Sequence, residues 1–246
     1  MITVYHRPKT LDEALTLLTQ PNMVPLGGGT LLAHPTPDPV EAVDLQALGL
    51  DTIEKSGNNL EIGATVTLQH LLESEHCPEA LKSALKLEAP LNLRNAATVA
   101  GTLVTSDGRS TFAAVMLALD AKLTIIVSRR SQIVNLGEFL PLRPRGLITA
   151  ITIPLNVKLA FDHVARTPAD KPIVCAALAQ WNSGRTRLAL GGYGKSPLLA
   201  MDGTEAEGVE AAARNAFHEA KDEWASAEYR MDVAATLAKR CSERIS

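Results

Sequence analysis

The segment from Thr111 to Leu119, TFAAVMLAL, is the feature that most constrains the fold of this 246-residue chain. It is almost wholly apolar and leaves no face for solvent, so it predicts a buried helix. Upstream of it, a short β-type step at Thr98-Val99 leads into the small residues Ala100-Gly101-Thr102, where we expect a tight turn. Small residues let a ligand approach the backbone closely, and free N–H groups in a turn bind anions. The pattern therefore predicts an anion-binding loop that is anchored on a buried helix.

A second run of small residues, Gly27-Gly28-Gly29-Thr30, follows a short apolar stretch near the start of the chain. It is neither a GxGxxG dinucleotide fingerprint nor a GxxxxGK[ST] phosphate loop. A lone glycine run is more often a flexible turn than a phosphate site. The hypothesis from the residues alone is that this run and the turn at Ala100–Thr102 form the two halves of a phosphate cradle.

The composition is that of a globular protein, because 46% of the residues are hydrophobic and 21% are charged. The net charge of −3 and the aromatic content of 4% give no reason to expect a nucleic-acid partner. We expect no membrane span and no leader segment, since no apolar run is long enough. Three cysteines without a CxxC pair indicate reduced thiols and a cytoplasmic protein.

The length allows two or three small subdomains. The first is expected over residues 1–57 and follows the order strand, helix, strand, glycine turn. Thr10 to Glu13 fits a capping box that begins its helix. The proline-rich stretch from Pro35 to Pro39 predicts an extended connection, and the turn residues Gly57-Asn58-Asn59 mark the end of this subdomain.

The second subdomain is expected over residues 58–157 and contains the buried helix with its turn. Its other predicted strands are Leu60–Ile62, Leu123–Val127, Ile133–Leu136 and Leu147–Ile153. Its other predicted helices are a short one that Thr67 caps and that runs through Leu72, and one from Pro78 to Ala89.

The third unit is expected over residues 158–246 as an α+β domain with a three-stranded antiparallel sheet. The predicted strands are Leu159–Val164, Ile173–Trp181 and Arg187–Leu190. Thr204 to Glu207 fits a capping box that opens a helix ending near Trp224, and Ser226 is expected to cap the final helix. Strands followed by helices make a separate packed layer, so the predicted fold class is α+β.

Residues that could carry chemistry themselves are scarce in this sequence. The nearest approach to a metal cluster is His70, His76 and Cys77, whose spacing fits no zinc pattern. The chain has no Gly-x-Ser-x-Gly nucleophile elbow. Any redox chemistry would therefore come from a bound cofactor.

With both loops in view, the chain resembles the flavoprotein (medium) subunit of the xanthine dehydrogenase and aerobic carbon monoxide dehydrogenase family. The first loop of that family reads roughly Ala-Gly-Gly-Thr-Asp-Leu, and Gly27 to Leu32 is similar. The second reads roughly Arg-Asn-x-Ala-Thr-Ile-Gly-Gly-Asn-Leu and then Ala-Asp-Pro, and Arg94 to Gly108 is similar. Three further similarities lie at Leu117–Ala121, Leu188–Pro197 and Ser226–Arg230. All five occur in family order across nearly the whole chain, which makes the match specific.

The resemblance implies an FAD-binding fold of two N-terminal α/β subdomains of the PCMH type and a C-terminal α+β domain. It also implies an oxidoreductase subunit of a molybdenum hydroxylase, in which FAD passes electrons from iron–sulfur clusters to an external acceptor. The implied partners are a molybdenum-cofactor large subunit and an iron–sulfur small subunit in a hetero-oligomer. The residues expected to hold FAD are Gly27, Gly28, Gly29, Thr30, Leu31, Thr98, Ala100, Gly101, Thr102 and Asp107.

Two alternatives stay open. One is a family relative that has weakened or lost FAD binding and acts as a structural or assembly subunit. Its basis is that Ala100, Thr102 and Thr111 stand where the family usually has glycine, asparagine and aspartate. The other is a free-standing binder of small molecules in which both glycine turns are structural, and the similarity at Ser226–Arg230 argues against it.

Overall fold

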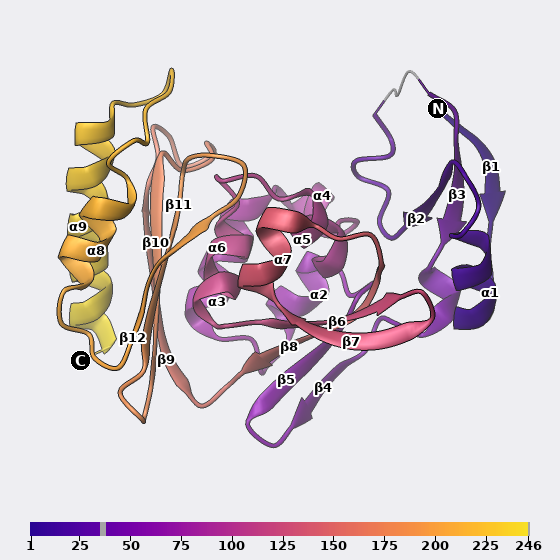
Figure 1. Ribbon diagram of the computed structural model, residues 1–246, viewed down its shortest axis with the longest axis horizontal. Helices are drawn as coiled ribbons and strands as arrows, with labels where there is room; N and C mark the ends of the chain where they lie inside the picture. Colours follow the sequence, from indigo (N-terminus) through magenta and orange to yellow (C-terminus); the bar gives the residue numbers. More distant parts are fainter. Residues whose placement is uncertain (35–37, 246) are drawn as a thin grey trace.

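The computed structural model describes residues 1–34 and 38–245, and three sheets lie along its length (Figure 1). The first sheet is parallel, in the order β1-β3-β2, with β1 at Ile2–His6, β2 at Met23–Leu26 and β3 at Val40–Asp44. Helix α1 (Leu11–Leu17) connects β1 to β2, and a 3₁₀ turn, η1, covers Gln46–Leu48. The predicted order of strand, helix, strand and glycine turn is thus confirmed. Residues 35–37 of the predicted connection lie outside the described residues.

Helix α1 begins as its capping box predicts. The hydroxyl of Thr10 accepts a hydrogen bond from the Glu13 N–H at 3.3 Å. The carboxylate of Glu13 accepts the N–H of Lys9 at 3.0 Å. The first bond satisfies a backbone donor that a helix leaves free at its first turn, and the second ties the residue before the cap to that turn.

The middle sheet is antiparallel in the order β4-β5-β8-β6-β7. Its strands are β4 (Ile53–Ser56), β5 (Asn59–Gly63), β6 (Lys122–Val127), β7 (Arg130–Asn135) and β8 (Leu147–Pro154). The helices of this part are α2 (Leu68–Glu73), α3 (Glu79–Glu88), α4 (Leu91–Arg94), α5 (Val99–Thr105), α6 (Thr111–Ala118) and α7 (Leu136–Leu142). The boundary predicted after residue 57 falls in the turn between β4 and β5, and these two strands belong to one sheet.

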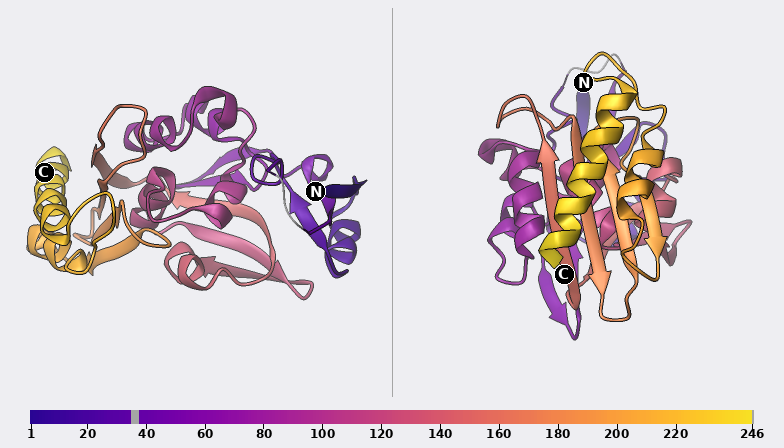
Figure 2. Two further views of the ribbon diagram at one scale, coloured as in Figure 1. Left: turned by 90° about the horizontal axis from the view of Figure 1, so that it is seen from above. Right: turned by 90° about the vertical axis from the view of Figure 1, so that its left-hand side faces the viewer.

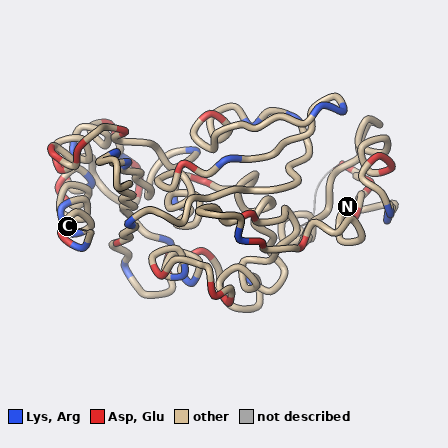
Figure 3. The backbone as a smooth tube through the Cα atoms, turned by 90° about the horizontal axis from the view of Figure 1, so that it is seen from below, with Lys and Arg blue, Asp and Glu red and all other residues tan. Residues whose placement is uncertain are grey.

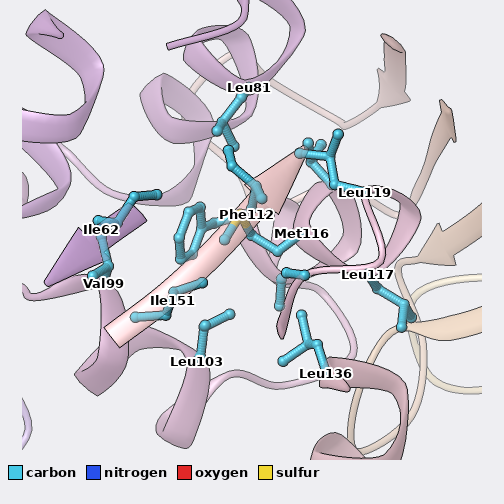
Figure 4. Close-up of a cluster of buried hydrophobic side chains, with 14 of the residues drawn as sticks. Ile62, Leu81, Val99, Leu103, Phe112, Met116, Leu117, Leu119, Leu136 and Ile151 are labelled. Carbon is cyan, nitrogen blue, oxygen red and sulfur yellow. The ribbon is translucent and has the colours of Figure 1, made fainter. Parts of the chain in front are cut away.

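Helix α6 is the centre of the largest core, as its sequence predicts. Every one of its residues is buried. Its side chains Phe112 and Met116 lie among Ile62, Val99 and Ile151 from the surrounding elements (Figure 4). The helix also contacts β10 and β11 of the third sheet, so it joins the middle part of the molecule to the C-terminal part.

The third sheet is antiparallel in the order β12-β11-β10-β9. Its strands are β9 (Val157–Val164), β10 (Val174–Trp181), β11 (Thr186–Gly191) and β12 (Leu198–Gly203). Helices α8 (Val209–Ala216) and α9 (Ala227–Ile245) cover its outer face (Figure 2). The α+β class is confirmed, and the predicted three strands are corrected to four. Strand β12 was missed because LLAMDG lacks the alternation of a half-buried strand, and its pairing with β11 contains a bulge at Leu188–Ala189.

Two local predictions were wrong. The segment predicted as a β-type step and a turn is the first half of α5, which begins after its N-cap Thr98. The predicted capping box at Thr204–Glu207 begins no helix, since α8 starts after Gly208, whose φ is 83°. That helix ends at Ala216 and not near Trp224.

Two further features concern the surface. Within residues 1–34 and 38–245, no helix is long and apolar enough to cross a membrane. Lys and Arg are mixed with Asp and Glu over the molecule, so neither sign of charge dominates it (Figure 3).

Candidate functional site

A cavity of about 440 Å³ lies where the first sheet, the helices of the middle part and the β9–β10 connection meet. All ten residues predicted to hold a cofactor line this one cavity: Gly27, Gly28, Gly29, Thr30, Leu31, Thr98, Ala100, Gly101, Thr102 and Asp107. Residues that the sequence did not indicate also line it, among them Thr65, Glu88, Gly146 and Lys171. The structure therefore brings the two glycine segments together, although roughly seventy residues separate them in sequence.

The two glycine segments are in direct contact, and their missing side chains make that contact possible. A Cβ on Gly28 would overlap the carbonyl oxygen of Ala96. A Cβ on Gly27 or on Gly101 would lie 2.8 Å from the hydroxyl oxygen of Thr98. Glycine at positions 27 and 28 is thus explained by packing of the first segment on the second, and glycine at 101 by the cap Thr98 within its own segment.

Several backbone N–H groups of the first segment have no acceptor among the described residues. No N–H group of Gly28, Gly29 or Thr30 donates to another described residue. Gly29 has a φ of 71°, a left-handed conformation that glycine adopts without strain. Consecutive N–H groups with this kind of backbone form a concave nest that binds anions.

The N–H groups of the second segment all donate to acceptors of the protein. Val99 N–H donates to Val66 O at 2.9 Å, and Ala100 N–H donates to Ala64 O at 3.3 Å. Gly101 N–H donates to the Thr98 hydroxyl at 3.2 Å. The Thr102 N–H and hydroxyl both donate to Thr98 O, at 2.9 and 2.8 Å. The first turn of α5 is thus closed by the protein itself, and its residues shape the cavity wall.

One buried hydroxyl of the cavity wall has no partner among the described residues. Thr65 is 8% exposed, and its Oγ1 makes no hydrogen bond there. An unpaired buried hydroxyl costs about 1–3 kcal/mol, so a polar group of a ligand that reached it would offset that loss. Thr65 lies shortly after the end of β5, and no motif in the sequence distinguishes it.

At the other end of the cavity, Asp107 links the middle part to the C-terminal domain. Its carboxylate accepts the N–H of Arg109 at 2.9 Å and the ammonium of Lys171 at 2.9 Å. Arg109 in turn donates to the carbonyl of Pro172 at 3.0 Å. These bonds hold the β9–β10 connection beside the cavity.

Backbone pairing at three glycines continues this link. Gly108 N–H donates to Gly194 O at 3.0 Å, and Gly192 N–H donates to Gly108 O at 2.6 Å. A Cβ on Gly108 would overlap the carbonyl oxygen of Tyr193, so only glycine fits there. The ring of Tyr193 lies 5.2 Å from the guanidinium of Arg230.

Arg230 is fully buried and fastens the loops of the C-terminal domain. Its guanidinium donates to the carbonyl oxygens of Ala220 at 2.8 Å and Ala225 at 3.1 Å, and to the Asp222 carboxylate at 2.8 and 2.9 Å. This arginine ends the Ser226–Arg230 segment that the sequence indicated, and Ser226 caps α9 as predicted by accepting the Tyr229 N–H at 3.2 Å. The segment therefore lies outside the cavity wall and holds the C-terminal loop that pairs with Gly108.

Metal ligands do not gather at this site. Among the residues that the structure describes, no three His, Cys, Asp or Glu side chains come close enough to hold a metal ion.

The chain is similar to known proteins over its whole length. Residues 1–156 match the family described as the FAD binding domain in molybdopterin dehydrogenase. The uncharacterized protein YgfM of Escherichia coli strain K12 is 30% identical, over 96% of this chain and 94% of that protein. The carbon monoxide dehydrogenase medium chain of Afipia carboxidovorans is 26% identical, over 98% of this chain and 95% of that one.

Solved structures share the fold. A chain of the reconstituted CO dehydrogenase from Oligotropha carboxidovorans superposes with a TM-score of 0.83 and is 27% identical. The match covers 98% of this chain and 96% of that chain. The similarity therefore includes the C-terminal domain, which lies beyond the residues matched by the family.

Proposed function

The chain belongs to the family of FAD-binding domains in molybdopterin dehydrogenases, and from that membership we propose that it is the flavin-carrying subunit of a molybdenum hydroxylase. The cavity between its two glycine segments is the proposed FAD site. The observation that carries the proposal is that the N–H groups of Gly28, Gly29 and Thr30 donate to no other described residue. A pyrophosphate needs several such donors at close range, and charge-assisted hydrogen bonds of this kind are strong.

The residues present fit a dinucleotide with one anionic part and two ring systems. The nest at Gly28–Thr30 would hold the phosphates, and the hydroxyl of Thr65 offers one further polar contact. Leu31, Leu68 and Leu93 supply apolar wall for a ring. When bound, FAD supplies the electron-transfer chemistry, while this chain binds it, orients it and limits its contact with water.

A second candidate function, a structural subunit that no longer binds FAD, is favoured by one observation. All four N–H groups at Val99–Thr102 are taken by protein acceptors, so α5 offers no donor to a phosphate. The methyl group of Ala100 does not decide between the candidates. Ala100 is 9% exposed and belongs to the main hydrophobic core.

We further propose that the chain assembles with a molybdenum-cofactor large subunit and an iron–sulfur small subunit in a cytoplasmic hetero-oligomer. The similarity to a carbon monoxide dehydrogenase medium chain supports assembly with larger and smaller subunits. Leu31, Leu93 and Val104 line the cavity yet are 57%, 43% and 44% exposed, which leaves apolar surface at its rim for a partner. Three free cysteines agree with a reducing compartment.

The test of the proposed function is an absorbance spectrum of the purified chain followed by titration with FAD. Binding is expected to quench flavin fluorescence and to raise the melting temperature of the protein, because a ligand that binds only the folded state stabilises it. A colourless protein that shows neither change at any FAD concentration would favour the structural subunit.

A further inference from the structure

Glu88, the last residue of α3, is a carboxyl group in the wall of the cavity. It lies at the beginning of α6, where backbone and hydroxyl donors converge on it. Nothing in the local sequence around Glu88 shows that α3 ends beside α6, so the sequence does not distinguish this residue.

All hydrogen bonds to this carboxyl reach one of its two oxygens. Oε2 of Glu88 accepts the hydroxyl of Ser110 at 2.9 Å and the N–H of Phe112 at 2.9 Å. Thr111 Oγ1 lies 3.2 Å from the same oxygen, but its single proton serves the shorter bond of 2.7 Å to Ala84 O. Two donors therefore fill the two lone pairs of Oε2. Oε1 receives no hydrogen bond from the described residues.

The cationic groups near Glu88 are engaged with other partners. Lys171, from the β9–β10 connection, is already paired with Asp107 at 2.9 Å. Arg94 directs its guanidinium to backbone and amide oxygens, including Ala89 O at 2.7 Å. Cys175 of β10 stays a neutral thiol, because burial raises its pKa to about 12. Helix α6 has no charged residue.

Burial raises the pKa of the Glu88 carboxyl, and this outweighs the hydrogen bonds to Oε2 and the attraction of Lys171, which lower it. The asymmetry of its hydrogen bonds indicates where the proton lies. On Oε2 a proton would compete with two donors, whereas on Oε1 it meets none.

We propose that Glu88 holds a proton on Oε1 and donates a hydrogen bond from that atom to a ring acceptor of the cofactor in the cavity. This inference rests on the proposed function. A neutral O–H donor suits an uncharged carbonyl oxygen or ring nitrogen, whereas a carboxylate would repel the same lone pairs. Glu88 is thus a binding residue whose protonation sets the affinity for the cofactor.

The experiment is a set of FAD titrations of the full chain over a range of pH, with wild type, Glu88→Gln and Glu79→Gln. Wild-type affinity is expected to fall as pH rises through the pKa of Glu88, approaching about tenfold for each pH unit above it. The Glu88→Gln variant keeps an oxygen for Ser110 and Phe112 and an N–H toward the cavity, so its affinity should not change with pH. Glu79, at the exposed start of α3, is the control, and its variant should keep the wild-type profile.

An infrared spectrum of the cofactor-free chain gives the second readout. The carbonyl stretch of a protonated carboxyl is expected in wild type and in Glu79→Gln, and it should be missing in Glu88→Gln. If FAD binds with the same pH profile in wild type and Glu88→Gln, or if the infrared band is unchanged, this inference is overturned while the proposed function stands. If FAD binds to none of the proteins at any pH, the proposed function fails and the donor role fails with it.

Discussion

Gly28 lies so close to the backbone of Ala96 that a Cβ at Gly28 would overlap the Ala96 carbonyl oxygen. This contact joins the first glycine segment to the loop that precedes α5. Because the obstacle is backbone and not a flexible side chain, it cannot move aside without shifting one of the two loops.

We therefore expect Gly28→Ala to destabilise the protein by about 1–3 kcal/mol, the usual cost of overpacking, and to weaken FAD binding with it. Urea unfolding and FAD titration measure the two effects. Gly137→Ala is the matched control, since a Cβ there would meet its nearest neighbour, Leu117 Cδ1, at an ordinary 3.5 Å. Equal stability of the two variants would contradict the proposed loop contact.

The hydroxyl of Thr98 closes the first turn of α5 by accepting the Gly101 N–H at 3.2 Å. Replacing Thr98 by valine keeps the shape of the side chain but leaves that donor without a partner. The expected loss is about 0.5–2 kcal/mol in the free energy of unfolding, as for other N-caps. Thr98→Ser keeps the cap and should lose less, whereas a similar loss in both variants would show that the methyl group matters more than the hydroxyl.

Structural features that depend on residues close together in the sequence could be predicted from the sequence. The apolar run of α6 predicted its burial, and the residues Thr10, Thr67 and Ser226 predicted helix caps that the structure confirms. The start of α5 was not predictable in this way. Val99, with Gly101 and Thr102 beside it, has a low helix propensity, so the local pattern favoured a turn over the helix that packing stabilises.

In the candidate site, too, some residues could be predicted from the sequence and others depend on the three-dimensional fold. The glycine segments could be paired from the sequence because a family resemblance connects them. Thr65 and Glu88 could not be found, because each lies in an ordinary segment and reaches the cavity only through the folding of β5 and α3. Their significance comes from hydrogen bonds that they make or lack, and these exist only in three dimensions.

Replacing Arg230 by methionine is expected to destabilise the protein by about 3–5 kcal/mol, as when one partner of a buried ion pair is removed. Asp222 and several carbonyl groups would lose their donor. Thermal and urea unfolding measure the loss. Arg240→Met is the control, because Arg240 is exposed and its nearest carboxylate oxygen is 3.9 Å away, so a change within about 0.5 kcal/mol is expected. A loss that small in Arg230→Met would contradict the role of Arg230.

The pairing of Asp222 also predicts how stability depends on pH. Burial alone would raise the pKa of this carboxyl, but hydrogen bonds from Arg230 and from the Trp224 and Ala225 N–H groups bring it below its ordinary value. The folded state therefore binds its proton less readily than the unfolded state. The resulting stabilisation is fully present above the ordinary carboxyl pKa of about 3.9 and is lost as pH falls through the lowered value.

Unfolding free energies measured between neutral and strongly acidic pH test this, with Asp222→Asn as the comparison. The variant is less stable at neutral pH, and its stability should fall less steeply on acidification than that of wild type. Parallel curves for the two proteins would assign the acid sensitivity to other carboxyl groups.

Thr65 allows an effect on cofactor binding to be separated from an effect on stability. Its hydroxyl is buried without a partner among the described residues, so Thr65→Val removes an unsatisfied group and replaces it with a methyl of similar size. We expect unchanged or higher stability, by up to about 1 kcal/mol, together with weaker FAD binding, because the ligand loses a hydrogen-bond partner. Thr186→Val is the control. The buried Thr186 hydroxyl donates to Gly184 O at 3.0 Å and accepts from Gln180 at 3.1 Å, within the C-terminal sheet. Its loss should therefore lower stability and leave FAD binding unchanged. Unfolding curves measure the stability of both variants, and FAD titrations measure their affinity. An unchanged FAD affinity in Thr65→Val would show that this hydroxyl does not contact the cofactor.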